Sequence, residues 1–517
     1  MLRETRRIAI AAMAGTAALL LPVLQTDAQQ TGAQQAATPA ALQRLAPQLD
    51  QIFTQFMADN HVPGLVYGIV ANGKLEYVKP FGIQDVDAKR PVTPDSLFRI
   101  ASMTKAFTAL TLLHLRDEGK VSLLANVEDY IPEMRGWTYP TTDSPRIKVI
   151  DILGHTPGFV TDDPWGDRQT PIPEAEFTAM LQKGIAFDHP PETQFAYSNL
   201  GFAMVGRVIQ NVEKRPYSAV AGDLLLKPLG MSSSGFNIAN SPADRRAIGY
   251  RWENNAWARE PDLGEGAFTS IGGLQTSAND YAKWVAYLLS AWPPRSDADT
   301  GPVPRKTMRE LAKGSDFPLG VTRPGDKRAN PCRQAEVYGM ALYVVNDCDL
   351  PWAITHNGGY PGYGSSVLMF PDAGVGLFVF ANRTYAGPSP TLWAAALQLK
   401  AAGLLNTRPI PVSADLAKAY AAVGQSWQGG AIAPIAPMAA VNFFMDRTAA
   451  NWKLELARLK SQTGDCDTAT PITALGAQTG NFEWSCQRAK LKGRLLLAPP
   501  NDGKVQSITF DVVKPSP

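Results

Sequence analysis

The segment Ser102-Met103-Thr104-Lys105 opens an apolar run that continues through Ala106, Phe107, Ala109, Leu110 and Leu113. This spacing predicts a helix that begins at or just before Ser102. Because Ser102 and Lys105 are three residues apart, they share one face of that helix and the amine can reach the hydroxyl. A serine becomes a good nucleophile when a neighbouring base takes its proton, and a lysine is such a base only when burial or nearby cations lower its pKa. The pattern predicts an acyl-transfer site, although taken alone it is also typical of a solvated helix start.

Two distant segments supply polar groups of the kind that such a site needs. Tyr197-Ser198-Asn199 follows the loop 188–192 and precedes a helical run, so we expect it on a loop that faces a cleft. His356-Asn357-Gly358-Gly359 lies in a strand-like stretch from Trp352 to Phe370, which the turn 371–374 joins to a second strand, 375–380. Glycines in a strand let the backbone of a substrate approach closely.

In this order and context the three segments resemble the β-lactamase-related serine hydrolases. That family holds class C β-lactamases, secreted DD-carboxypeptidases, D-aminopeptidases and related esterases. The resemblance covers roughly residues 39–405. Four further blocks look like the same family: Leu97-Phe98-Arg99-Ile100-Ala101, Leu153-Gly154-His155-Thr156-Pro157-Gly158, Lys227-Pro228-Leu229-Gly230-Met231 and Gly272-Gly273-Leu274.

The resemblance implies a role for each polar residue of the first two segments. Ser102 would be the acylated nucleophile and Lys105 its proton acceptor. Tyr197 would shuttle the proton to the leaving group, or act as the base in acylation, deacylation or both. Asn199 would hydrogen-bond either the substrate amide or Lys105.

The third segment would bind the substrate, and here the chain departs from the family pattern. The resemblance implies substrate contacts along His356, Asn357, Gly358 and Gly359, with the backbone N–H groups of Ser102 and Gly359 as the oxyanion hole. Most class C β-lactamases carry a lysine where this chain has His356, whereas members with His-x-Gly include peptidases and esterases. Since a histidine is a weaker fixed cation for a substrate carboxylate, the departure disfavours β-lactams.

We therefore expect a serine hydrolase that cleaves an amide (peptide) or ester bond through an acyl-enzyme on Ser102. Its substrates would be small peptides, amides or esters. Two alternatives stay open: a class C-like β-lactamase, and a non-catalytic penicillin-binding protein that binds or senses peptides without turnover.

Other chemistries lack their motifs. The sequence contains no His-Glu-x-x-His, no paired Cys/His spacing, no Gly-x-Ser-x-Gly and no phosphate-binding glycine loop, so we expect neither a metal nor a cofactor. His155 is expected to be a hydrogen-bonding residue of a loop or the core rather than a base. The formal net charge of +2 gives no indication of a nucleic-acid partner.

The N-terminus predicts export. Three arginines precede an apolar run, 8–24, and Thr26-Asp27-Ala28 is an acceptable cleavage site, so residues 1–28 are predicted to be a signal peptide and the mature protein to be periplasmic or secreted, with no membrane association after cleavage. In an oxidising compartment the four cysteines form two plausible disulfides, Cys332 with Cys348 and Cys466 with Cys486.

The fold class predicted is α/β: a sandwich of an antiparallel sheet with flanking helices, as in β-lactamases and transpeptidases, with a helical subdomain inserted between about 100 and 330. A first helix over about 39–58 and strands over 65–70 and 75–80 precede the nucleophile. The domain would span 39–405, after a disordered start at 29–38. A linker, 406–430, and a small α+β domain, 431–517, would follow.

Overall fold

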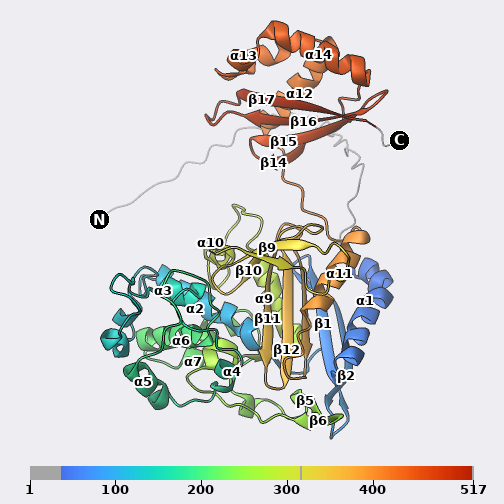
Figure 1. The fold of residues 1–517 in the computed structure, drawn as a ribbon. Helices are drawn as coiled ribbons and strands as arrows, with labels where there is room; N and C mark the ends of the chain where they lie inside the picture. The colour runs from blue at the N-terminus through green and yellow to red at the C-terminus, as the bar shows by residue number, and fades with distance from the viewer. Residues whose placement is uncertain (1–36, 315–316, 515–517) are drawn as a thin grey trace, which may run out of the picture.

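The computed structural model describes residues 37–314 and 317–514. These residues form a large α/β domain and a small C-terminal domain, which Figure 1 shows in orange and red. The predicted signal peptide and residues 29–36 lie outside the described residues. The predicted disordered start, 29–38, is too long at its C-terminal end, because the hydroxyl of Thr38 caps the first helix. Within the described residues, no helix combines the length and the apolar character needed to cross a bilayer.

The large domain is built on a nine-stranded antiparallel sheet with the order β3-β2-β1-β13-β12-β11-β10-β9-β8. Its central strands β1, β12 and β13 are buried along their whole length, because helices cover both faces of the sheet. The strands are β1 (Gly64–Ala71), β2 (Lys74–Asp85), β3 (Arg90–Pro91), β8 (Leu319–Thr322), β9 (Arg333–Tyr338), β10 (Tyr343–Asn346), β11 (Ala353–Tyr360), β12 (Tyr363–Phe370) and β13 (Val375–Ala381).

The two faces of the sheet carry separate hydrophobic clusters. The helices α1 (Pro39–Asp59) and α11 (Ser389–Ala401) cover one face, where Phe53 and Leu392 are fully buried (Figure 1). On the other face α9 (Ala278–Leu289) joins the sheet to the inserted helical subdomain, and Trp284 of α9 stacks on Phe107 with ring centroids 3.7 Å apart. The subdomain holds α2 (Thr104–Asp117), α3 (Val149–Gly154), α4 (Trp165–Arg168), α5 (Glu174–Lys183), α6 (Asn199–Glu213), α7 (Tyr217–Ala221), α8 (Thr269–Gly272) and α10 (Arg305–Met308), with the strand pairs β4 (Phe98–Arg99) with β7 (Gln275–Thr276) and β5 (Tyr250–Glu253) with β6 (Ala256–Arg259).

The strand-like stretch from Trp352 to Phe370 is two strands rather than one. β11 and β12 pair from Ile354↔Met369 to Tyr360↔Tyr363, and the chain reverses at Pro361 and Gly362. Gly362 has φ +87°, and a Cβ there would lie 2.7 Å from the Cα of Gly249. Only glycine fits this reversal. The apolar pattern of the sequence gives no sign of it, because the residues on both sides of the turn are typical of strands. The strands β8, β9 and β10, which extend the sheet beyond β11, were not predicted either.

The C-terminal domain begins earlier than the sequence predicts. Its sheet has the order β14 (Thr473–Gly476), β15 (Thr479–Ser485), β16 (Lys490–Leu497) and β17 (Val505–Val513). Its helices are α12 (Ala414–Gly429), α13 (Phe443–Asp446) and α14 (Ala449–Thr463). Because α12 buries Leu416, Val423 and Trp427 in the core of this domain, the predicted linker 406–430 ends before α12, no later than residue 412.

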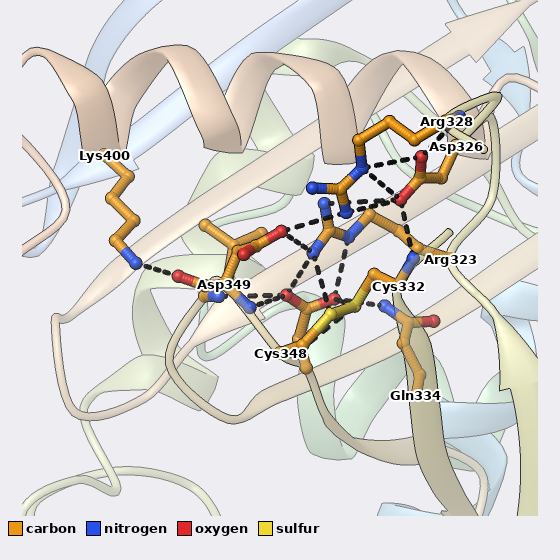
Figure 2. Close-up of a disulfide and its surroundings, with 10 residues drawn as sticks. Arg323, Asp326, Arg328, Cys332, Gln334, Cys348, Asp349 and Lys400 are labelled. Carbon is orange, nitrogen blue, oxygen red and sulfur yellow. Dashed lines mark hydrogen bonds and ion pairs between the residues drawn. A yellow bond between two sulfur atoms is a disulfide. The ribbon is translucent and has the colours of Figure 1, made fainter. Parts of the chain in front are cut away.

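Both predicted disulfides are present, Cys332–Cys348 and Cys466–Cys486. The first lies beside a dense ionic cluster that ties the loop after β8 to the loop after β10 (Figure 2). Arg323 donates to Asp347 at 2.6 and 2.8 Å and to Asp349 at 2.7 Å, and the Arg323 and Asp347 side chains are almost wholly buried. These cysteine and aspartate atoms resemble a metal-binding set, but the sulfurs are bonded to each other and the guanidinium neutralises the carboxylates. The cluster therefore has a structural role, which is to hold the two loops together.

Candidate active site

Ser102 lies in a single 3₁₀ turn, Ala101–Met103, directly before α2. The residue before it, Ala101, has φ +50°, a left-handed conformation that is unusual for a residue with a side chain. The turn is held by the sheet, because Ser365 of β12 donates its hydroxyl to the carbonyl of Ile100 at 2.7 Å. Ser102 is thus fixed at the start of a buried helix, as the sequence predicts.

Lys105 points its amine at Ser102. Its Nζ lies 3.1 Å from Ser102 Oγ, 2.7 Å from Asn199 Oδ1 and 3.1 Å from the carbonyl oxygen of Ile271. The side chain is wholly buried, and this burial lowers the pKa of Lys105 to about 8, against the opposing attraction of three nearby aspartates. A lysine with this pKa loses its proton within reach of neutral pH, so it can act as a base.

Tyr197 lies beside the same amine but has the opposite electrostatic character. Lys105 Nζ is 4.9 Å from the centroid of the Tyr197 ring. Burial raises the pKa of Tyr197 well above its usual value, and the neighbouring Ser102 hydroxyl only partly opposes the rise. The Tyr197 hydroxyl is buried and has no hydrogen-bond partner of standard geometry in the described part of the chain. It is a neutral phenol whose donor is still available.

His155 and Asp162 hold the loop that bears Tyr197 and Asn199. His155 Nδ1 accepts the N–H of Ser198 at 3.0 Å, and its ring packs on Tyr197 with centroids 4.3 Å apart. Burial lowers the pKa of His155 well below its usual value, so it is a neutral hydrogen-bonding residue, as predicted. Asp162 accepts the N–H groups of Asn199 and Leu200 at 2.6 and 2.8 Å, which caps α6.

The third segment forms the edge of β11 that faces Ser102. β10 pairs with β11 only at Ala353–Thr355, so residues 356–360 lie against the turn 101–103 instead. Gly358 is required there, because a Cβ would lie 2.4 Å from the carbonyl oxygen of Ile100. On the opposite side of the strand the exposed Asn357 side chain accepts a hydrogen bond from Ser366 at 2.7 Å.

His356 is uncharged. Its Nδ1 lies 2.6 Å from its neighbour's carbonyl oxygen and its Nε2 lies 3.3 Å from the Tyr338 hydroxyl. Burial, and secondarily the nearby Lys105, lower the pKa of His356 to about 3. At this position the strand therefore offers no positive charge to a substrate carboxylate.

This arrangement of a buried serine-lysine pair, a tyrosine loop and a glycine-rich strand edge agrees with the comparison to known families. A model of the Beta-lactamase family matches residues 49–402. The chain belongs to this family.

Curated relatives match about two thirds of this chain. Protein flp of Staphylococcus aureus (strain N315) is 28% identical over 343 residues, which are 65% of this chain and 62% of that protein. Beta-lactamase-like protein 2 of Dictyostelium discoideum is 29% identical over 356 residues, which are 67% of this chain and 61% of that protein. The chain thus spans less than two thirds of the length of these relatives.

Solved structures share the fold. The octameric penicillin-binding protein homologue from Pyrococcus abyssi superposes with a TM-score of 0.57 at 19% identity, covering 91% of this chain and 98% of that one. A class C β-lactamase from Rhodobacter sphaeroides gives a TM-score of 0.52 at 19% identity, covering 68% and 99%. The β-lactamase-like sandwich predicted from the sequence is confirmed.

The site therefore brings together Ser102, Lys105, Tyr197, Asn199 and the strand that runs from His356 to Gly359. The aspartates of the loop before α6 were missed, as was Tyr385, which lies against Gly359. Asp163 accepts a hydrogen bond from the Asn199 amide, and Asp167 accepts one from the Tyr385 hydroxyl. Their only sequence signal is the presence of three carboxylates within the six residues 162–167.

Proposed function

We propose that this protein is an exported serine hydrolase that cleaves amide or ester bonds through an acyl-enzyme on Ser102. The observation that carries the proposal is the wholly buried Lys105 amine, 3.1 Å from Ser102 Oγ, with a pKa of about 8. Neither a solvated helix start nor a purely structural lysine requires this combination of burial and contact. Membership of the Beta-lactamase family supports the same class of activity.

The groups in the site account for each proton of acylation. Neutral Lys105 takes the proton of Ser102 Oγ as that oxygen bonds to the substrate carbonyl carbon. The resulting oxyanion accepts hydrogen bonds from the N–H groups of Ser102 and Gly359, and each such donor contributes a few kcal/mol to lowering the barrier. Tyr197 gives its phenolic proton to the departing amine or alkoxide and recovers one from the Lys105 ammonium. Water then releases the acyl group by the reverse sequence.

The neutral His356 supports a choice among substrates. A β-lactam or a peptide with a free terminal carboxylate brings a negative charge, and His356 supplies no cation to pair with it. Esters and amides without a nearby carboxylate do not need that cation. We therefore infer that esters and peptide amides are preferred over β-lactams.

The proposal is tested with purified protein and a panel of p-nitrophenyl esters, D- and L-aminoacyl amides, D-Ala-D-Ala peptides and a chromogenic cephalosporin. We expect sustained turnover of an ester or amide that Ser102→Ala abolishes. Stoichiometric release followed by a plateau would instead favour a non-catalytic binding protein. Cephalosporin turnover that exceeds every ester and peptide about tenfold in kcat/KM, roughly 1.4 kcal/mol, would restore the β-lactamase alternative.

Export is proposed from the predicted signal peptide and is supported by the two disulfides. Mass spectrometry of protein recovered from outside the cytoplasm would show a mature N-terminus near residue 29 and four oxidised cysteines. An intact N-terminus or free thiols would contradict the proposal.

A further inference from the structure

A tyrosine from a distant loop covers one side of the expected oxyanion strand. Tyr385 follows β13 and has φ +47°, and its backbone N–H donates to the carbonyl of Tyr363 at 3.2 Å. A Cβ added to Gly359 would lie 2.7 Å from Tyr385 Cδ1, so the ring packs directly on the backbone of Gly359. The side chain is nevertheless 36% exposed, which places an aromatic surface beside the reacting carbonyl where a substrate can reach it.

The hydroxyl of Tyr385 is anchored across the site. It donates to Asp167 Oδ2 at 3.0 Å, and Asp167 is a buried residue of the short helix α4. The preceding residue, Gly166, packs on Asn199, since a Cβ at Gly166 would lie 2.5 Å from Asn199 Cβ. A continuous line of contacts thus runs from Gly359 through Tyr385 and α4 to Asn199, which itself accepts a hydrogen bond from Lys105.

This line of contacts begins at Gly359, at the opposite end of the segment 356–359 from His356. The Tyr197 ring, which serves the leaving group, lies near His356 with centroids 6.2 Å apart. Gly359 is three residues further along the strand, about 10 Å away in an extended chain. With the carbonyl oxygen held at Gly359 and the leaving group directed to Tyr197, the acyl substituent extends toward Tyr385.

We propose that Tyr385 determines the size of the acyl group that Ser102 accepts, and that Asp167 is a positioning residue that holds the tyrosine ring in place. This inference rests on the proposed hydrolase function. Breaking the hydrogen bond to Asp167 frees the ring to swing aside, and removing the ring opens the acyl side of the site altogether.

The test compares p-nitrophenyl octanoate with p-nitrophenyl acetate, which share one leaving group, and measures the ratio of their kcat/KM values in the full chain. We expect Tyr385→Ala to raise the octanoate-to-acetate ratio at least tenfold. Tyr385→Phe and Asp167→Ala should each raise the octanoate-to-acetate ratio by a smaller, similar factor. Because both substitutions remove the same hydrogen bond, the ratio of the double variant should be no higher than that of either single variant. Asp167→Asn keeps an oxygen acceptor and should retain the wild-type ratio.

Trp257→Ala is the matched control, since Trp257 is an exposed aromatic residue of β6 that donates to the carbonyl of His61. Its ratio should equal that of the wild type. A ratio within threefold of wild type in folded Tyr385→Ala overturns the inference. If that variant fails to fold, unchanged ratios in both Tyr385→Phe and Asp167→Ala overturn it instead. A wild-type protein that neither turns over nor is acylated by any ester defeats the proposed function, and this inference with it.

Discussion

At the scale of single residues, burial shifts the pKa values of the two proposed proton-transfer groups beside Ser102 in opposite directions. Burial lowers the pKa of Lys105 and raises that of Tyr197, because it destabilises the charged form of each side chain. Near neutral pH the lysine can therefore lose a proton while the tyrosine keeps its own. This division favours Lys105 over Tyr197 as the base of the free protein, an alternative that the sequence leaves open.

A pH profile tests this assignment. Below its pKa of about 8, Lys105 is an ammonium that cannot accept the serine proton, so ester kcat/KM should rise about tenfold per pH unit from pH 6 and level off above pH 8. Lys105→Arg keeps the positive charge but cannot give up its proton, and we expect it to lose at least about 10³-fold in kcat/KM. Stopped-flow hydrolysis of p-nitrophenyl acetate measures both, with Ser102→Ala as the background. A flat profile between pH 6 and 9 would exclude Lys105 as the base.

The sequence predicts the catalytic residues better than their supports. Ser102 and Lys105 are joined by helical spacing, whereas Tyr197 and Asn199 are found through the resemblance of their segment to a known family. Asp162 and Tyr385 act through contacts with residues 37 and 26 positions away, Asn199 and Gly359. No local pattern encodes such contacts, which arise only when the loops meet.

At the scale of elements, the cap of α6 links stability to the site. Asp162→Ala leaves the N–H groups of Asn199 and Leu200 without their acceptor, and should lower the free energy of unfolding of the large domain by about 1–3 kcal/mol. It should also reduce ester turnover, because Asn199 begins the same helix. Urea unfolding followed by circular dichroism measures the first effect.

The matched control is Thr448→Ala, which removes one N-cap bond, to Asn451 at 3.3 Å, from α14 of the other domain. It should cost about 1 kcal/mol in the C-terminal domain and leave ester turnover unchanged. An Asp162→Ala variant as stable as the wild type would show that water replaces the carboxylate as acceptor.

Elements with strong local signals were predicted closely, and others were not. The predicted helix 39–58 and the predicted strands 65–70 and 75–80 match α1, β1 and β2 to within a few residues. The exception is the C-terminal end of β2, which extends to Asp85. The break between β11 and β12 depends on the packing of Gly362 against Gly249, 113 residues earlier, and so escapes any reading of local hydrophobicity. The short strands β8 and β10 have four residues each, too few for a periodic signal.

At the scale of the whole molecule, the two domains have separate cores. The residues of the candidate catalytic motifs belong to the large domain, and the C-terminal domain has its own hydrophobic cluster around Trp427 and Trp484. Arg408 still belongs with the large domain, since it donates to the carbonyls of Asp372 and Trp292. Ile410 forms a β-bridge with Ala474 of β14, so the division between the domains falls between Arg408 and Ile410.

Truncation after residue 412 tests whether the site is independent of the tail. Because no catalytic contact described above involves the C-terminal domain, we expect the truncated protein to retain acylation of Ser102 by p-nitrophenyl acetate. Calorimetry of the full chain should show two unfolding transitions, and only one after truncation. A soluble, folded truncation that is not acylated would show that the tail completes the site.

The pairing of the cysteines has a consequence for how the chain matures. Four cysteines allow three pairings, and here each cysteine is joined to its neighbour in sequence, 16 and 20 residues apart. A chain that emerges N-terminus first presents Cys332 and Cys348 together before Cys466 is available. Oxidation during emergence can then produce each native bridge directly, with no mispaired bond to reshuffle. In the proposed export, the order in which the cysteines emerge therefore favours the native connectivity over the two crossed pairings.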